Sequence, residues 1–234
     1  MSLDLHPPDS PADQAALGVI DSLGGAERDE QPYRHWVLSE IFPKEMVDAL
    51  RTLPFDPPSL DGVSGARELH NNTRRYFDAE NNARYGVCRA LAEAFQSPAV
   101  VDAIARTTGA PIKDCYLRIE YAQDVDGFWL QPHTDLGVKK LTLLYYLGDG
   151  DSQSDLGTDI YGPDRAWAKR STFATNTALV FVPSDRTWHG FEPRPIHGVR
   201  KSVIVNYVTE DWRAREQLAY PETPVRAASK TRTA

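Results

Sequence analysis

A histidine and an aspartate two residues apart, His133 and Asp135, stand in the segment QPHTD. The longer run around them, GFWLQPHTDLGVKKLTLLYYL, has the composition of β-strands. Side chains alternate along a strand, so the two point to one face, about 6.6 Å apart at about 3.3 Å per residue. Such a pair can form a local hydrogen bond at a strand end, or it can supply two ligands of a metal ion.

A third metal ligand has two downstream candidates. His189 follows the strand-like segment TALVFVPSDRTW, whose end can direct a side chain back across a barrel. His197 stands in a Pro/Gly turn, PRPIHG, which is typical of an exposed loop. With His189, two histidines and one carboxylate occupy one face of a metal and leave three positions open. Non-haem Fe(II) oxygenases have this arrangement.

An arginine follows His189 by eleven residues, in the strand-like segment GVRKSVIVNYV. The period of two places Arg200, Ser202, Ile204 and Asn206 on one face. An arginine inside a barrel needs an anionic partner, because a buried unpaired charge is very costly. This strand offers no acidic residue. A ligand carboxylate would fit the guanidinium fork, with the hydroxyl of Ser202 as a further donor.

These residues together resemble a known family. The motifs His133-Thr134-Asp135, His189 and Arg200-Lys201-Ser202 are similar to the HxD…H triad and Arg-x-Ser of the Fe(II)- and 2-oxoglutarate-dependent dioxygenases. The segment LTLLYYLGD resembles the strand after HxD in the prolyl-hydroxylase-like branch. The resemblance implies a mainly β fold, a double-stranded β-helix (jelly-roll) core supported by N-terminal helices. It also implies Fe(II) bound by His133, Asp135 and His189, with 2-oxoglutarate and O2 as co-substrates.

The resemblance assigns further residues to 2-oxoglutarate. Arg200, Ser202 and Tyr146 would bind its far carboxylate, and Thr142 shares the face of Tyr146. Tyr121 stands where the branch often has a tyrosine near the oxo-acid, although an apparent extra loop at 124–127 lengthens the distance to His133. Gly157-Thr158 replace a glycine pair of the branch. Halogenating members lack the carboxylate, so Asp135 implies a hydroxylase (or a desaturase) that converts 2-oxoglutarate to succinate and CO2.

The substrate contacts are predicted from strand parity and from one loop. Trp129 and Gln131 share the parity of His133, and Asn206 lies inward beyond Ser202. The loop HNNTRRYFD offers donors for an anionic group, and a substrate contact is also open to its histidine: His70, Asn71, Asn72, Arg74 and Arg75. Lys139 and Lys140 are predicted to face solvent at a turn. These residues favour a small polar or anionic metabolite, such as an amino acid or a biosynthetic intermediate.

Two other functions fit the same motifs. A prolyl-type hydroxylase acting on a protein or peptide would need an open groove for an extended chain. A cupin-like protein that binds metal or senses 2-oxoglutarate without turnover would need no substrate donors. A cupin more usually has a His-x-His pair in place of His133 and Asp135.

The elements that must position these residues fall into four parts. Residues 1–30 form an acidic, loosely ordered lead-in, and residues 31–111 a helical support region with a long loop at 54–82. Residues 112–210 contain the strand-like runs of the catalytic core. Residues 211–234 add a helical turn and a frayed basic tail. Whether the loop at 54–82 closes as a lid is left open.

Composition narrows the class of protein. The chain of 234 residues is 41% hydrophobic and carries a net charge of −7, without a basic stripe for nucleic acid. Neither a membrane-spanning run nor a signal peptide is evident. The two cysteines lack a CxxC spacing, which favours a reducing cytoplasm. We expect a small-molecule substrate and no nucleic acid or membrane partner, and nothing in the sequence indicates an oligomeric state.

Overall fold

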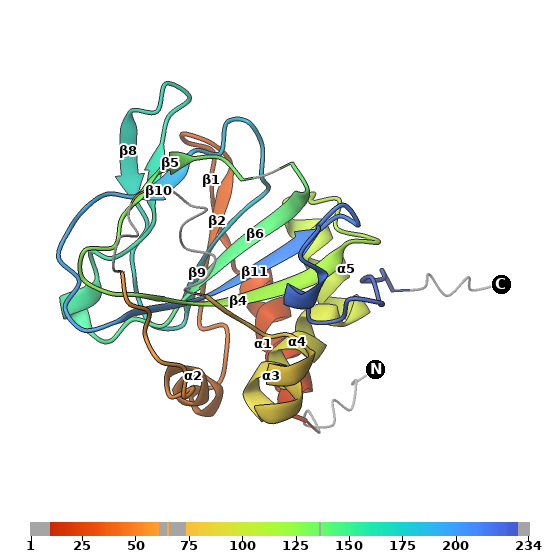
Figure 1. Ribbon diagram of the computed structural model, residues 1–234. Coiled ribbons are helices and arrows are strands. Elements are labelled where there is room, and N and C mark those ends of the chain that lie inside the picture. Colours follow the sequence, from red (N-terminus) through yellow and green to blue (C-terminus); the bar gives the residue numbers. More distant parts are fainter. Residues whose placement is uncertain (1–9, 61–64, 66–73, 136, 229–234) are drawn as a thin grey trace.

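The computed structural model describes residues 10–60, 65, 74–135 and 137–228 (Figure 1). Its α-helices are α1 (Pro11–Gly24), α2 (Lys44–Arg51), α3 (Ala79–Arg84), α4 (Gly86–Gln96) and α5 (Pro98–Thr108). Its strands are β1 (Glu27–Asp29), β2 (His35–Ser39), β3 (Arg75–Tyr76), β4 (Tyr116–Asp124), β5 (Leu130–His133), β6 (Lys139–Tyr146), β7 (Asp159–Tyr161), β8 (Trp167–Arg170), β9 (Thr177–Phe181), β10 (His189–Phe191) and β11 (Arg200–Val208). The core is mainly β, as predicted.

The strands form two antiparallel sheets. The major sheet has the order β1-β2-β9-β6-β11-β4-β3, and the minor sheet has the order β5-β10-β7-β8. The last of the described strands, β11, lies between β6 and β4. It pairs with β4 from Arg200 opposite Asp124 to Val208 opposite Tyr116, and it pairs Ser202 with Tyr146 on β6. This register decides which side chains of three strands share a layer.

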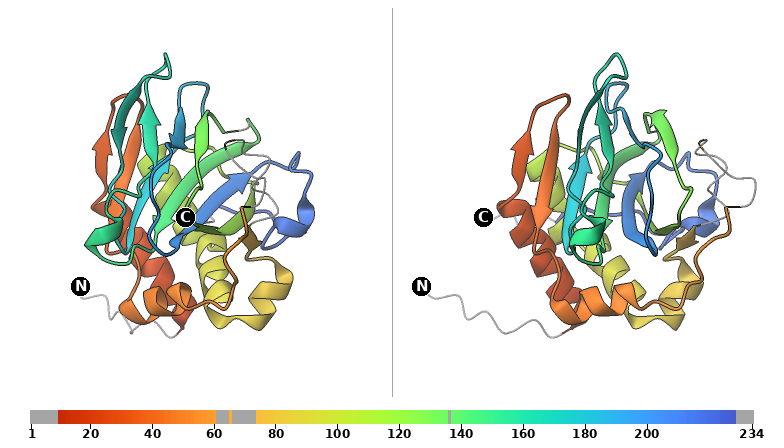
Figure 2. Two further views of the ribbon diagram at one scale, coloured as in Figure 1. Left: turned by 60° about the vertical axis from the view of Figure 1, so that its left-hand side comes forward. Right: turned by 90° about the vertical axis from the view of Figure 1, so that its left-hand side faces the viewer.

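The helices pack on one face of the major sheet. In both views of Figure 2 they gather below the strands, and α1, α4 and α5 share a buried apolar cluster with residues such as Leu117, Ile119 and Tyr121 of β4. A second, smaller cluster lies toward the minor sheet and includes Leu144, Tyr146, Phe181 and Phe191. The major sheet is therefore covered on both faces.

Local sequence signals explain two of the helices. The Ser97 hydroxyl accepts a hydrogen bond from Val100 N at the start of α5, Pro98 is its first residue, and Gly109 ends it at φ 74°. Helix α2 begins directly after Pro43, which is its N-cap residue. The expectation of a loosely ordered lead-in at residues 1–30 is wrong for the described part. Helix α1 is capped by Ser10 and buries Ala15, Val19 and Leu23 at four-residue spacing.

The segment after β11 folds back on β4. A short 3-10 turn spans Arg215–Gln217, Ala219 N donates to Leu117 O at 3.0 Å and Val225 N donates to Cys115 O at 2.8 Å. Val225 is fully buried. The prediction of a frayed tail is therefore wrong as far as residue 228, because the backbone of this segment pairs with the strand beside it.

The predicted long loop at 54–82 contains strand β3 and the first residues of α3. His70, Asn71 and Asn72 lie outside the described residues, so their substrate contacts stay predictions. Within the ranges that the structure describes, no helix is long and apolar enough to cross a bilayer.

Candidate active site

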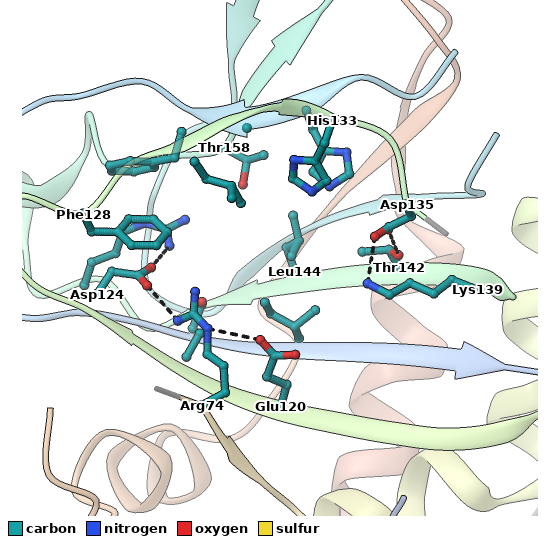
Figure 3. Close-up of a pocket in the computed structure, with 18 of the residues that line it drawn as sticks. Arg74, Glu120, Asp124, Phe128, His133, Asp135, Lys139, Thr142, Leu144 and Thr158 are labelled. Carbon is teal, nitrogen blue, oxygen red and sulfur yellow. Dashed lines mark hydrogen bonds and ion pairs between the residues drawn. The ribbon is translucent and has the colours of Figure 1, made fainter. Parts of the chain in front are cut away.

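The two histidines and the aspartate predicted as metal ligands come together at one end of the pocket between the sheets (Figure 3). His133 ends β5, His189 begins β10, and the two residues face each other in the register of these strands. Their ring centroids are 4.3 Å apart. Ligand atoms of His133, Asp135 and His189 all lie within 4.8 Å of one another. This spacing lets all three bind one ion.

The backbone fixes how both rings are presented. Nδ1 of His133 lies 3.0 Å from the carbonyl oxygen of Gln131, and Nδ1 of His189 lies 2.9 Å from that of Thr187. A carbonyl oxygen accepts, so each Nδ1 carries a proton and donates it. The tautomer then presents Nε2 as the ligand nitrogen, which is a common arrangement at histidine-bound metals.

The carboxylate of Asp135 is oriented by two donors (Figure 3). Lys139 Nζ lies 2.7 Å from Oδ1, and Thr142 Oγ1 donates to Oδ2 at 2.6 Å. The prediction that Lys139 faces solvent is wrong. Its side chain is only 6% exposed, because it begins β6 on the pocket side. Thr142, predicted to contact 2-oxoglutarate, lines the pocket and donates to the predicted metal ligand Asp135.

A bulge in β5 changes which residues reach the pocket. His189 pairs with His133 and Phe191 pairs with Leu130, so three steps on β5 oppose two on β10. The extra residue shifts the parity, and Leu130 lines the pocket together with His133. Trp129 and Gln131 are not among its lining residues, so the structure does not support them as substrate contacts. Trp129 packs on Gly65, where an added Cβ would lie 2.2 Å from the indole.

Arg200 reaches the opposite end of the same pocket, and its guanidinium is held in place. Nε donates to Leu156 O at 2.7 Å, and Nη1 lies 2.5 Å from Asp124 Oδ2. The guanidinium carbon lies 4.8 Å from the ring centroid of Phe191 and 5.1 Å from that of Phe173. The arginine is buried as predicted, but a protein carboxylate is among its partners.

The acidic partner of Arg200 stands on the neighbouring strand. Asp124 faces Arg200 in the β4–β11 register, and its other oxygen lies 2.7 Å from Nη1 of Arg74. Glu120 lies on the same face of β4, four residues before Asp124. It pairs with Arg74 at 3.3 Å and with Arg118 at 2.7 Å. The five residues form a continuous chain of ion pairs along one wall, part of which is visible in Figure 3.

The sequence carried a signal for this wall. Arg118, Glu120 and Asp124 share one parity along β4, whereas Leu117, Ile119 and Tyr121 have the other. Arg200 has no acidic residue in its own strand, and the pairing of β11 with β4 supplies Asp124 instead. Burial alone would raise the pKa of Glu120, but the guanidinium groups of Arg118 and Arg74 hold it below its usual value. Burial likewise opposes the charge on Arg74, but Asp124 and Glu120 outweigh it and raise its pKa.

Two aromatic rings, those of Tyr76 and Trp212, contact Arg118 in this wall. The guanidinium carbon of Arg118 lies 4.8 Å from the ring centroid of Tyr76 and 4.8 Å from that of Trp212, so the cation is sandwiched between two rings. Arg118 and Trp212 both line the pocket, which encloses about 120 Å³.

The remaining predicted residues divide by strand parity. Tyr121 points to the opposite face of the sheet, where its hydroxyl donates to Leu50 O at 2.9 Å, so its assignment to 2-oxoglutarate is wrong. Arg75 is exposed and Asn206 is fully buried beneath the pocket. Neither lines the pocket, so the structure does not support them as substrate contacts. Asn206 instead donates to Thr142 Oγ1 at 2.9 Å.

Tyr146 stands behind the pocket wall. Its hydroxyl lies 2.8 Å from Thr158 Oγ1 and 2.8 Å from Ser171 Oγ, and Thr158 lines the pocket. Gly157 permits this contact between strands, because an added Cβ would lie 1.5 Å from Ser171 O. Tyr146 therefore reaches the pocket through Thr158, whereas Arg200, Ser202 and Arg74 line it directly.

Comparisons with known proteins identify the architecture. Neither family models nor curated proteins match the sequence. Among solved structures, a Pseudomonas putida prolyl-4-hydroxylase superposes with a TM-score of 0.53 at 15% identity, over 88% of this chain and 99% of that one. A prolyl 4-hydroxylase from Phytophthora capsici gives 0.54 at 16% identity, over 89% and 68%. A Trichoplax adhaerens prolyl hydroxylase in complex with a hypoxia inducible factor peptide fragment gives 0.51 at 14% identity, over 87% and 93%.

The chain has the prolyl-hydroxylase fold. Its two sheets are the double-stranded β-helix predicted from the sequence. Two histidines and one carboxylate are a donor set that suits Fe(II), and the oriented Nδ1 protons and the two donors on Asp135 suit a bound cation. At the other end of the pocket, Arg200 and Ser202 suit a carboxylate. The residues of this prolyl-hydroxylase fold thus fit both Fe(II) and 2-oxoglutarate.

Proposed function

We propose that this protein is an Fe(II)- and 2-oxoglutarate-dependent oxygenase that hydroxylates a small polar or anionic metabolite. One observation carries the proposal: a two-histidine, one-carboxylate cluster within 4.8 Å shares a pocket with a buried arginine. Neither half alone would be specific. A metal cluster without Arg200 fits a cupin, and a buried arginine without the cluster fits an ordinary ion pair.

The residues divide the work between the two ends of the pocket. His133, Asp135 and His189 would hold Fe(II), which when bound supplies O2 activation coupled to oxidative decarboxylation of 2-oxoglutarate. Lys139 and Thr142 keep the Asp135 carboxylate oriented. Arg200 and Ser202 would bind the far carboxylate of the co-substrate, and the rings of Phe173 and Phe191 hold the guanidinium in one plane.

The polar wall favours a polar or anionic substrate. Arg74 lines the pocket with its side chain 8% exposed, and Phe128 lies against it with the ring centroid 5.5 Å from the guanidinium carbon. A charged wall of this kind is costly to build and gains nothing from an apolar ligand. We therefore infer that Arg74 contributes to substrate recognition.

A peptide substrate is the second candidate, and the likeness to prolyl hydroxylases favours it. One of the similar structures, the Trichoplax adhaerens prolyl hydroxylase, is a complex with a peptide fragment. A peptide hydroxylase would release succinate faster with proline-containing peptides than with free amino acids or biosynthetic intermediates. Measuring succinate release against both panels separates the two substrate classes.

We also infer a reducing compartment such as the cytoplasm. Cys88 and Cys115 are both free and buried, and cytosolic proteins keep their thiols reduced.

An anaerobic titration tests the cofactor assignment. Fe(II) is added to the purified protein with 2-oxoglutarate, and the visible charge-transfer band between iron and the keto acid is followed. The band is expected in the wild type and should need much more 2-oxoglutarate in Arg200→Ala. Metal binding without the band would contradict the 2-oxoglutarate assignment and favour the cupin-like alternative.

A further inference from the structure

The ion pairs of the pocket wall form a chain of alternating charge. It runs Arg118–Glu120–Arg74–Asp124–Arg200, with N–O distances of 2.7, 3.3, 2.7 and 2.5 Å. Asp124 is the more enclosed of the two carboxylates, because its side chain is 2% exposed and that of Glu120 is 12% exposed. Each of its two oxygens faces a different arginine. Asp124 is therefore shared between Arg74 and Arg200.

The chain of ion pairs carries one surplus positive charge. It contains three guanidinium groups and two carboxylates, and burial limits the screening of these charges by solvent. A dicarboxylate co-substrate at Arg200 must share that guanidinium with Asp124. The two anions would then stand on the same cation, and like charges at such a distance weaken one another's binding.

We propose that Asp124 is an internal competitor of 2-oxoglutarate for Arg200, and that Arg74 is a positioning residue that moderates the competition. The inference rests on the proposed function. With Arg74 in place, one oxygen of the Asp124 carboxylate pairs with Arg74 and only the other pairs with Arg200. The surplus positive charge is then available to a ligand. Without Arg74, the carboxylate falls to Arg200 alone, and the ligand meets a neutral pair.

Members of this chain of ion pairs can be substituted one at a time, because each remaining member keeps a partner. In Arg74→Gln, Asp124 keeps Arg200 and Glu120 keeps Arg118. In Asp124→Asn, Arg200 keeps Leu156 O and Arg74 keeps Glu120. Arg74→Gln leaves the other buried charges paired, and in Asp124→Asn the guanidinium of Arg200 keeps the Leu156 carbonyl and the rings of Phe173 and Phe191.

The test is a double-mutant cycle on 2-oxoglutarate affinity. 2-Oxoglutarate is titrated calorimetrically into Ni(II)-loaded wild type, Arg74→Gln, Asp124→Asn and the double variant, with thermal melting to check folding. We expect Arg74→Gln to bind about tenfold more weakly, and Asp124→Asn to bind at least as tightly as wild type. In the Asp124→Asn background, Arg74→Gln should change the affinity by less than about twofold.

Two further variants separate the local effect of Arg74 from the effect of changing the net charge of the protein. Arg75→Gln is the matched control, because it removes the same charge from an exposed side chain on the next residue and should change the affinity by less than about twofold. Arg74→Lys keeps the charge and should recover most of the lost affinity.

The outcomes are separable. A tenfold loss that persists in the Asp124→Asn background, no loss in Arg74→Gln, or weaker binding by Asp124→Asn alone would each overturn the inference. The last of these still decides the matter if Arg74→Gln does not fold. Absence of 2-oxoglutarate binding in the metal-loaded wild type would instead contradict the proposed function itself.

Discussion

Strand β4 presents two different surfaces on its two sides. Leu117, Ile119 and Tyr121 point into the apolar cluster with the helices, whereas Arg118, Glu120 and Asp124 point into the pocket. The same nine residues thus build the scaffold and one wall of the site. Only the alternation of a strand separates the two roles.

The difference between these faces is energetic as well as chemical. Burial of the apolar face stabilises the fold by about 25 cal/mol per Å² removed from water. Buried ion pairs contribute little net stability, because desolvation offsets most of their attraction. The charged face is therefore held by the apolar one, and substitutions on the two faces should have separable effects.

The largest effect is expected from Asp135→Ala on the pocket side. Loss of a metal ligand should lower Fe(II) affinity by at least about 100-fold and reduce succinate formation to background. Asp185→Ala, which changes an exposed aspartate, is the control. Metal titration and succinate assay measure the effect, and full succinate production by Asp135→Ala would disprove the metal assignment.

Arg200→Ala should remove co-substrate binding while leaving the metal. Truncating one partner of a buried charge pair costs about 3 kcal/mol, which is about a hundredfold in the affinity for 2-oxoglutarate. Lys201→Ala is the matched control, because its side chain points to the other face and donates to Arg51 O at 2.7 Å. Equal losses in both variants would mean that the strand, and not the guanidinium, was disturbed.

On the apolar face, Ile119→Ala should destabilise the fold and spare the chemistry. Ile119 is fully buried, and its truncation is expected to cost about 2–5 kcal/mol of unfolding free energy. Denaturant unfolding measures the loss. At temperatures where the variant is folded, 2-oxoglutarate affinity should equal that of wild type, and a large fall in affinity would remove the distinction between the faces.

The smallest effect concerns the thiols. Burial raises the pKa of Cys88 to about 12 and that of Cys115 to about 11. A raised pKa keeps both thiols protonated at pH 8.5, where an ordinary cysteine is half ionised. Iodoacetamide should therefore label them only after unfolding, as mass spectrometry would show. Fast labelling of the native protein would mean that the apolar face opens readily.

Sequence motifs located the metal cluster and Arg200 because their residue types are uncommon together. Strand alternation also located Ser202. The same rule did not hold for Trp129 and Gln131, because β5 contains a bulge. The extra residue can be recognised only from the pairing of β5 with β10. It was not applied to Tyr121, which was assigned by its likeness to the family and whose parity places it against the helices.

Other parts of the molecule depend on contacts between segments far apart in the chain. The acidic partner of Arg200 stands 76 residues earlier, on β4. The short strands β7, β8 and β10 carry no alternation long enough to predict. Single-strand patterns give the faces of long strands, and pairing between strands gives the rest.

The position of β11 in the sheet bears on how the protein forms during synthesis. Because β11 lies between β6 and β4, both neighbours keep an unpaired edge until residue 208 has left the ribosome. Unpaired edges invite association with other chains, and pairings this far apart in sequence form slowly. The pocket is thus assembled only after β11 has been synthesised, and this nascent chain has a longer period than a hairpin-built sheet in which to meet a chaperone.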